Sequence, residues 1–185
     1  MNPTNSFLRT NFQFPADNVK KGYKFYSWTD STVIFGKGKK AWTPEDSLRT
    51  AITQKGYEIG DIKIQGGAEM PDFYTTLKEW IEIYAQGDPK QFKAYVQVVY
   101  SCNDIHKYGA KKMKDKPLRQ TTIDCFEKVV NLINACTNAI FICVGPAHLS
   151  FWGNHYTSGQ WKQGNMMTEL LHKSRMMFMD PQAQF

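Results

Sequence analysis

The sequence predicts an α+β fold, in the form of a predominantly helical single domain with a small antiparallel β element near the N-terminus. Two observations support this fold class. Apolar residues recur at helical spacing through most of the chain after residue 43. Residues 23–42 are instead rich in aromatic and β-branched residues on both sides of Thr29-Asp30, which is typical of a hairpin or small meander. The length of 185 residues fits one domain over 1–185, with 1–20 as an extended N-terminal arm.

Five helices are expected from their start signals and apolar stripes. Thr43-Pro44 begins the first helix, because threonine caps a helix and proline suits its first turn. Pro71-Asp72 and Asp88-Pro89 begin the next two helices in the same way. The clearest stripe runs over 122–138, and the last helix spans 165–178.

Two short strands are expected between these helices. Ile59, Ile62 and Ile64 indicate one strand before a Gly-Gly pair. The apolar run 139–144 indicates a second, buried strand that ends at Gly145-Pro146.

The composition indicates a folded protein outside the membrane. Apolar residues make up 42% of the chain and aromatic residues 14%, which is too much buriable surface for a disordered chain. The longest apolar run, 139–144, is far shorter than the roughly 18 residues of a spanning helix. Residues 1–17 show no secretory signal. We therefore expect a soluble cytoplasmic protein, in the host cell cytoplasm if the chain is viral, and no membrane partner.

The four cysteines are predicted to be core thiols. None belongs to a C-x-x-C pair, and the nearby histidines do not give a zinc spacing. Reduced thiols in apolar stretches behave as small hydrophobes and fit a reducing compartment. We accordingly expect no metal site.

The net charge of +6 favours an anionic partner, which is a phosphate-bearing ligand, nucleic acid or an acidic protein surface. Ordinary solubility charge explains the same value. The basic run 111–119 supplies lysines and Arg119, a residue that can hold a phosphate through a bidentate fork. A solvated loop between helices is the alternative for this run.

Trp152 and Gly153 form the most informative segment together with Asn165 and Arg175. A tryptophan beside a glycine can serve as a stacking platform for a base. Asn165 and Arg175 could then reach a ligand in the same cleft. The alternative is that Trp152 closes the core and Asn165 caps the last helix.

This segment resembles the C-terminal signature of the NADAR family, in which a Trp-Gly pair precedes a Gly-x-Asn, a Leu-Leu pair and an Arg. The matching positions are Trp152-Gly153, Gly164-Asn165, Leu170-Leu171 and Arg175. Upstream, Lys116-Pro117-Leu118-Arg119 and the helix that holds Glu82 are also similar, so that the resemblance covers about 76–178.

The resemblance implies hydrolysis of an N-glycosidic bond to a phosphorylated ribose. ADP-ribose-linked guanine, including guanine in nucleic acid, and a riboflavin precursor are the substrate types that it implies. Such a bond breaks with positive charge developing on the ribose, and a carboxylate stabilises that charge. Glu82 is the candidate carboxylate, with a solvated helix residue as its alternative, and Lys90 is the candidate for a lysine nucleophile.

The remaining candidate residues would bind the substrate. Lys116 and Arg119 would hold phosphates, Trp152 beside Gly153 would stack on a ring, and Asn165 and Arg175 would contact ribose or base. The scheme requires no cofactor and no metal.

Two other function classes stay open. A non-enzymatic viral nucleic-acid-binding or coat (nucleocapsid) protein fits the basic charge and aromatic content. A nucleotide-sequestering protein fits the absence, in 147–151, of the acid that the family has before its Trp-Gly pair. The sequence indicates no oligomeric state.

Overall fold

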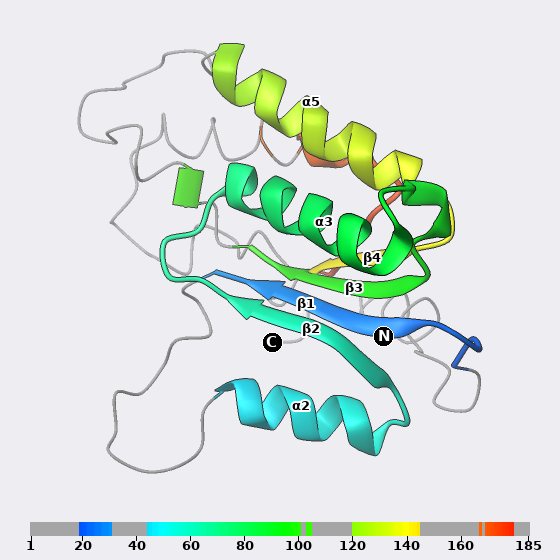
Figure 1. Ribbon diagram of the computed structural model, residues 1–185. Helices are drawn as coiled ribbons and strands as arrows, with labels where there is room; N and C mark the ends of the chain where they lie inside the picture. Colours follow the sequence, from blue (N-terminus) through cyan, green and yellow to red (C-terminus); the bar gives the residue numbers. More distant parts are fainter. Residues whose placement is uncertain are drawn as a thin grey trace, which may run out of the picture.

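Five strands form one sheet in the order β2-β1-β3-β4-β5, and every neighbouring pair is parallel (Figure 1). The strands are β1 Lys24–Thr29, β2 Glu58–Ile64, β3 Ala94–Val99, β4 Ile140–Val144 and β5 Met177–Met179. The computed structural model describes residues 19–30, 44–100, 103–104, 120–144, 167 and 169–179. The predicted N-terminal arm, 1–20, lies almost entirely outside these residues.

The parallel sheet shows that the predicted fold class is wrong. The chain has an α/β fold, not a mostly helical α+β domain with a small antiparallel β element. Within the expected hairpin 23–42, the described residues form the single strand β1, and both partners of β1 come from distant segments. The aromatic and β-branched residues of this segment correctly predict an extended strand. They do not indicate which strand pairs with it or in which direction.

Two predicted helices were also wrong. The helix expected after Asp88-Pro89 is a 3₁₀ turn, η2 Pro89–Gln91, followed by β3. A strand buried on both faces is a continuous apolar run, and such a run also matches a helical stripe. The helix expected over 165–178 is described as helical only at 167 and 169–171, and the chain then turns into β5.

Helices cover both faces of the sheet. Helices α3 Met70–Ala85 and α5 Gln120–Ala135 lie side by side on one face, and α2 Pro44–Gln54 lies on the other (Figure 1). The starts predicted at Thr43-Pro44 and Pro71-Asp72 agree with α2 and α3 within a residue. The order 2-1-3-4-5 is that of flavodoxin-like doubly wound sheets, because the first crossover runs to one side of β1 and the second returns across it.

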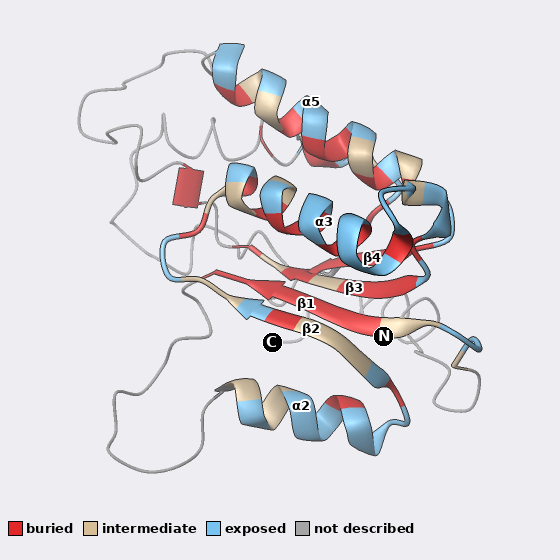
Figure 2. Ribbon diagram, in the orientation of Figure 1, coloured by how far each residue is buried: buried red, intermediate tan, exposed pale blue. Residues whose placement is uncertain are grey.

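The larger core lies between the sheet and the pair α3–α5 (Figure 2). Trp28 of β1 packs on Phe73 of α3 with ring centroids 5.2 Å apart, and Phe126 and Ile133 of α5 are fully buried in the same cluster. Burial of such large apolar surfaces is the main favourable term in folding, so this layer holds the helices on the sheet. A smaller core joins Ile52 of α2 to the opposite face.

Helices α3 and α5 have 16 residues each. Among the residues that the structure describes, no helix combines the length and the apolar character needed to cross a bilayer.

A bulge in β2 at Gly60 leaves room for the ring of Tyr26 in β1. The register skips Gly60 between Phe25 and Tyr26 of β1. A Cβ atom at Gly60 would lie 2.3 Å from Cζ of Tyr26, so only glycine leaves room for the ring. The Tyr84 hydroxyl donates to the Gly60 carbonyl oxygen at 3.0 Å, and the Trp80 indole N–H donates to Asp61 at 2.7 Å. These contacts fasten the end of α3 to β2.

We predict that Gly60→Ala lowers the free energy of unfolding by about 1–3 kcal/mol, because the new methyl group would overlap the Tyr26 ring. Urea unfolding followed by circular dichroism measures the change. Lys63→Ala, at an exposed position of the same strand, should cost less than about 0.5 kcal/mol. The double variant Gly60→Ala with Tyr26→Leu should cost less than the sum of its parts. A parental midpoint in Gly60→Ala would contradict the packing described here.

Candidate functional site

The carboxyl ends of β1 and β3 meet at the point where the direction of winding reverses. Asp30 follows β1 directly and its backbone N–H donates to the carbonyl oxygen of Val99, the last residue of β3, at 3.2 Å. In open α/β sheets this switch point is where ligands bind, because the two crossovers leave from it to opposite faces. The side chains that gather at this point are therefore the candidates for a functional site.

A buried polar cluster lies at this point. Asp30, Asn103 and Asp104 are 0%, 9% and 1% exposed. The Asn103 amide nitrogen donates to the Ala68 carbonyl oxygen at 2.9 Å and to Asp30 Oδ2 at 3.4 Å. One side chain thus connects the residue after β1, the turn after β2 and the segment after β3. Buried polar groups of this kind need partners, and these contacts supply them.

Asp104 connects the same cluster to the start of α3. Its carboxylate accepts a hydrogen bond from the Tyr100 hydroxyl. It also accepts one from the backbone N–H of Met70, with 3.2 Å between the nitrogen and Oδ2. Met70 is the first residue of α3. The N-terminus of a helix carries a partial positive charge, which favours a carboxylate beside it. Burial nevertheless raises the pKa of Asp104 to about 6, because the two hydrogen bonds offset only part of the desolvation of the charge.

The arrangement favours a positioning role for both carboxyl groups. A group with a pKa near 6 has the proton affinity expected of a general acid or base. Asp30 and Asp104 are, however, almost completely buried and bound to neighbouring groups, so neither is open to a substrate. Asn103 is the most exposed of the three at 9%, and its two amide N–H groups are directed at the Ala68 carbonyl oxygen and at Asp30.

Glu82 and Lys90, the predicted catalytic residues, lie at the opposite, amino edge of the sheet. Glu82 is exposed near the end of α3, and Lys90 is exposed in η2, which contacts α3. The structure therefore brings these two residues to one edge, away from the Asp30–Asn103–Asp104 cluster. The predicted substrate-binding residues Lys116, Arg119, Trp152, Gly153 and Asn165 lie outside the described residues.

Arg175, the remaining predicted substrate-binding residue, contacts the main chain at the end of α5. Its guanidinium donates to the carbonyl oxygens of Cys136 at 2.6 Å and Ala139 at 3.3 Å. Its backbone N–H donates to Asn134 Oδ1 at 2.8 Å. The bond to Cys136 satisfies a carbonyl group just beyond the C-terminus of α5, and the bond to Ala139 links this end of the helix to the start of β4.

The described cysteines are poor nucleophiles. Cys136 and Cys143 are buried, and burial raises the pKa of each thiol to about 12. Cys125 is half-buried and its pKa is raised to about 11, also mainly by burial. The thiolate is the reactive form of cysteine. Cys136 and Cys143 belong to the larger core, as predicted, whereas Cys125 does not. Among the described residues, no three His, Cys, Asp or Glu side chains gather as a metal site would require.

Sequence analysis missed Asp30, Asn103 and Asp104. Thr29-Asp30 was interpreted as the bend of a hairpin, and Asn103-Asp104 fell within a predicted helix. The signal was a polar residue shortly after each of two strands, since Asp30 follows β1 directly and Asn103 and Asp104 come four and five residues after the end of β3. This signal indicates a site only once the two strands are known to be parallel, because parallel strands bring their carboxyl ends to the same edge of a sheet.

Comparison with known proteins supports the fold. No family model matches the sequence, and no curated protein matches it either. Among solved structures, the chain is similar to LAE5, an alpha/beta hydrolase enzyme from the metagenome of Lake Arreo, Spain. The TM-score is 0.50 at 13% identity, over 86% of this chain and 77% of that chain. At this identity the similarity shows the α/β fold alone, and any reaction has to be argued from the residues of the site.

We predict that Asp104 makes the stability of the protein depend on pH. The unfolded chain loses this proton near pH 4 and the folded chain near pH 6, so the folded state binds more protons between these values. The free energy of unfolding should therefore fall by about 3 kcal/mol as the pH rises through this window. Urea unfolding at a series of pH values measures the slope.

Two variants test the origin of this slope. Asp104→Asn should remove it, because the amide does not titrate. Tyr100→Phe removes a hydrogen bond that lowers the pKa of Asp104, so it should extend the falling limb to higher pH. An unchanged profile in Asp104→Asn would show that another group is responsible.

We predict that Arg175→Ala destabilises the protein by about 1–3 kcal/mol, because the carbonyl oxygens of Cys136 and Ala139 lose a charged donor. Thermal unfolding measures the loss. Lys173→Ala, two residues away and exposed, provides the control for removal of a charge from the same turn. Equal unfolding temperatures for the two variants would argue against the structural role of Arg175 and leave the predicted ligand contact as its function.

Proposed function

We propose that the chain is a hydrolase whose reaction centre lies over the carboxyl ends of β1 and β3. The observation that carries the proposal is the buried Asp30–Asn103–Asp104 cluster at the switch point of a doubly wound sheet. The similarity in fold to an alpha/beta hydrolase enzyme supports the same class of reaction.

A carboxylic ester is the substrate class that this geometry supports best. Asp30 and Asp104 are too buried to flank a sugar ring, as a carboxylate-based glycosidase requires. The Asn103 amide has two N–H groups, and the one that meets Asp30 at the longer distance of 3.4 Å would turn to the oxyanion that forms when an ester carbonyl is attacked. The shorter bond to the Ala68 carbonyl oxygen, at 2.9 Å, would keep the amide in place while this N–H group changes its partner.

The nucleophile and the general base of this reaction would belong to residues outside the described part of the chain. Ser31 follows Asp30 in the sequence, and a serine hydroxyl is a common nucleophile for esters. A serine needs a general base, and His106, His148 and His155 also belong to the part of the chain that the structure does not describe. Ser31 is the first residue to replace, since it adjoins the cluster along the chain.

An N-glycosidase is the second candidate function, favoured by the resemblance of 152–175 to the NADAR family. Its substrate would be an ADP-ribose-like or ribose-phosphate compound, including ADP-ribosylated guanine in nucleic acid. Glu82 and Lys90, which share the amino edge and are exposed, would then carry the reaction. The two candidate functions thus place the chemistry at opposite edges of the sheet, and variants at each edge separate them.

We predict that the protein hydrolyses p-nitrophenyl acetate and that Asn103→Ala lowers kcat by about 100-fold, through loss of a donor to the oxyanion. Ser31→Ala should abolish turnover, and Glu82→Gln should leave it unchanged. Release of p-nitrophenol is followed by absorbance. Unfolding of each variant in urea checks that the loss of rate is not a loss of structure.

Release of ADP-ribose from ADP-ribosylated guanine, followed by mass, tests the second candidate. Release that is lost in Glu82→Gln and kept in Asn103→Ala would replace the esterase with the N-glycosidase. Failure of the folded protein on both substrates would overturn the hydrolase. Stoichiometric binding of ADP-ribose without product would then indicate a nucleotide-sequestering protein, and salt-dependent binding of oligonucleotides a nucleic-acid-binding or coat protein.

A further inference from the structure

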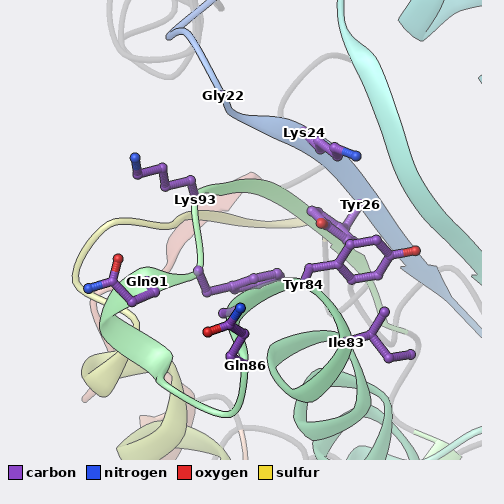
Figure 3. A pocket seen from close by; sticks show the side chains of 10 residues that line it. Gly22, Lys24, Tyr26, Ile83, Tyr84, Gln86, Gln91 and Lys93 are labelled. Carbon is purple, nitrogen blue, oxygen red and sulfur yellow. The ribbon is translucent and has the colours of Figure 1, made fainter.

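A cleft of about 580 Å³ opens at the amino edge of the sheet (Figure 3). It lies between the start of β1, the end of α3 and the segment from η2 to the start of β3. Its volume is within the range of sites that bind small molecules. The lining residues that matter here are Lys24, Ile83, Tyr84, Gln86, Gln91 and Lys93.

Two exposed apolar side chains line this cleft. Ile83 is 69% and Tyr84 41% exposed, and no other large hydrophobic residue in the described part of the chain is exposed. Adjacent exposed apolar groups beside a hollow are typical of a contact surface for a ligand. The Tyr84 hydroxyl is bound to the Gly60 carbonyl oxygen, so the ring is held in one orientation.

The backbone at the cleft adopts a costly conformation. Gln86 ends α3 with φ 52°, and among the described residues no other non-glycine residue has a positive φ. Glycine adopts this conformation without strain, whereas a glutamine here is strained by its Cβ atom. The side chains of Gln86 and Gln91 bring two amides to the cleft, and each amide can both donate and accept hydrogen bonds.

The cleft also has a cation that is available to an anion. Lys93 is exposed and forms no ion pair with any residue that the structure describes. The positive charge of Lys24 is paired within the protein, since its Nζ lies 3.0 Å from Glu58 Oε1. The same Nζ lies 5.8 Å from the centroid of the Tyr84 ring. Figure 3 shows Lys93 and Gln91 on one side and Lys24 and Tyr84 on the other, with Gln86 between them.

We propose that this cleft binds a purine nucleoside monophosphate. The base would stack on Tyr84 beside Ile83, the amides of Gln86 and Gln91 would bind the edge of the base, and Lys93 would bind the phosphate. A flat ring with a hydrogen-bonding edge and an anionic group matches the three kinds of contact that the cleft presents. The site is distinct from the hydrolytic centre proposed at the carboxyl edge.

Titration of the full chain with AMP by calorimetry tests this site. Binding should saturate at one AMP per chain. Lys93→Gln should weaken it about tenfold through loss of the charged contact to phosphate. Lys55→Gln, which removes an equivalent charge at the exposed end of α2 on the other face, should bind AMP like the parent. Adenosine should bind the parent about as weakly as AMP binds Lys93→Gln.

The stacking contact has its own pair of variants. Tyr84→Ala should weaken AMP binding about tenfold through loss of the ring. Tyr84→Phe keeps the ring and loses only the hydrogen bond to Gly60, so it should keep the affinity for AMP. The pair separates a loss of stacking from a loss of local structure.

Two results would overturn the proposal. One is the absence of saturable binding at millimolar AMP to the folded protein, and the other is equal affinity of Lys93→Gln and the parent. Hydrolysis of p-nitrophenyl acetate should be the same in Lys93→Gln and the parent. The hydrolytic centre and the nucleotide site can therefore fail independently.

Discussion

The parallel pairing of β1 with β2 on one side and β3 on the other is the constraint on which the rest of the structure depends. Parallel neighbours cannot be joined by tight turns, so each connection must cross a face of the sheet. Helix α2 makes the first crossing and α3 the second, on opposite faces. The chain leaves β1 toward α2 on one face and β3 toward α5 on the other, so the carboxyl ends of these two neighbouring strands form the switch point. The two faces of the sheet carry the two cores.

The Asp30–Asn103–Asp104 cluster shows how polar groups are kept at the centre of this fold. Leaving a carboxylate or an amide buried without partners would be costly. Asn103 is bound to Asp30 and to the Ala68 carbonyl oxygen, and Asp104 is bound to the Tyr100 hydroxyl and the Met70 N–H. Their partners come from the ends of β1, β2 and β3. The same bonds that satisfy the cluster therefore hold together the three segments from which a reaction centre would be built.

Helix α3 links the two edges of the sheet. Its first backbone N–H is bound by Asp104 at the carboxyl edge, and its last turns carry Trp80 and Tyr84, which are bound to β2 near the amino edge. The carboxyl edge is polar and buried, whereas the amino edge is aromatic and open. A single helix thus links the reaction centre that we propose at one edge of the sheet to the nucleotide cleft that we propose at the other.

The sequence by itself determined the local elements of this protein. The starts of α2 and α3, the apolar stripe of α5 and the strand β4 follow from capping residues and apolar spacing, which depend on near neighbours along the chain. The buried thiols of Cys136 and Cys143 were predictable for the same reason, since they lie in apolar stretches.

Only the tertiary structure decided the direction of the strands, their partners and the site. The apolar residues in 94–99 indicate a buried segment, and they fit a helix and a strand equally well. Pairing with β1 and β4 decides in favour of a strand. Asp30 and Asn103 are 73 residues apart and meet only because β1 and β3 are parallel neighbours. The spacing of apolar residues indicates which side chains of one segment are buried. Pairing between distant strands depends on the topology of the whole chain, which no local pattern encodes.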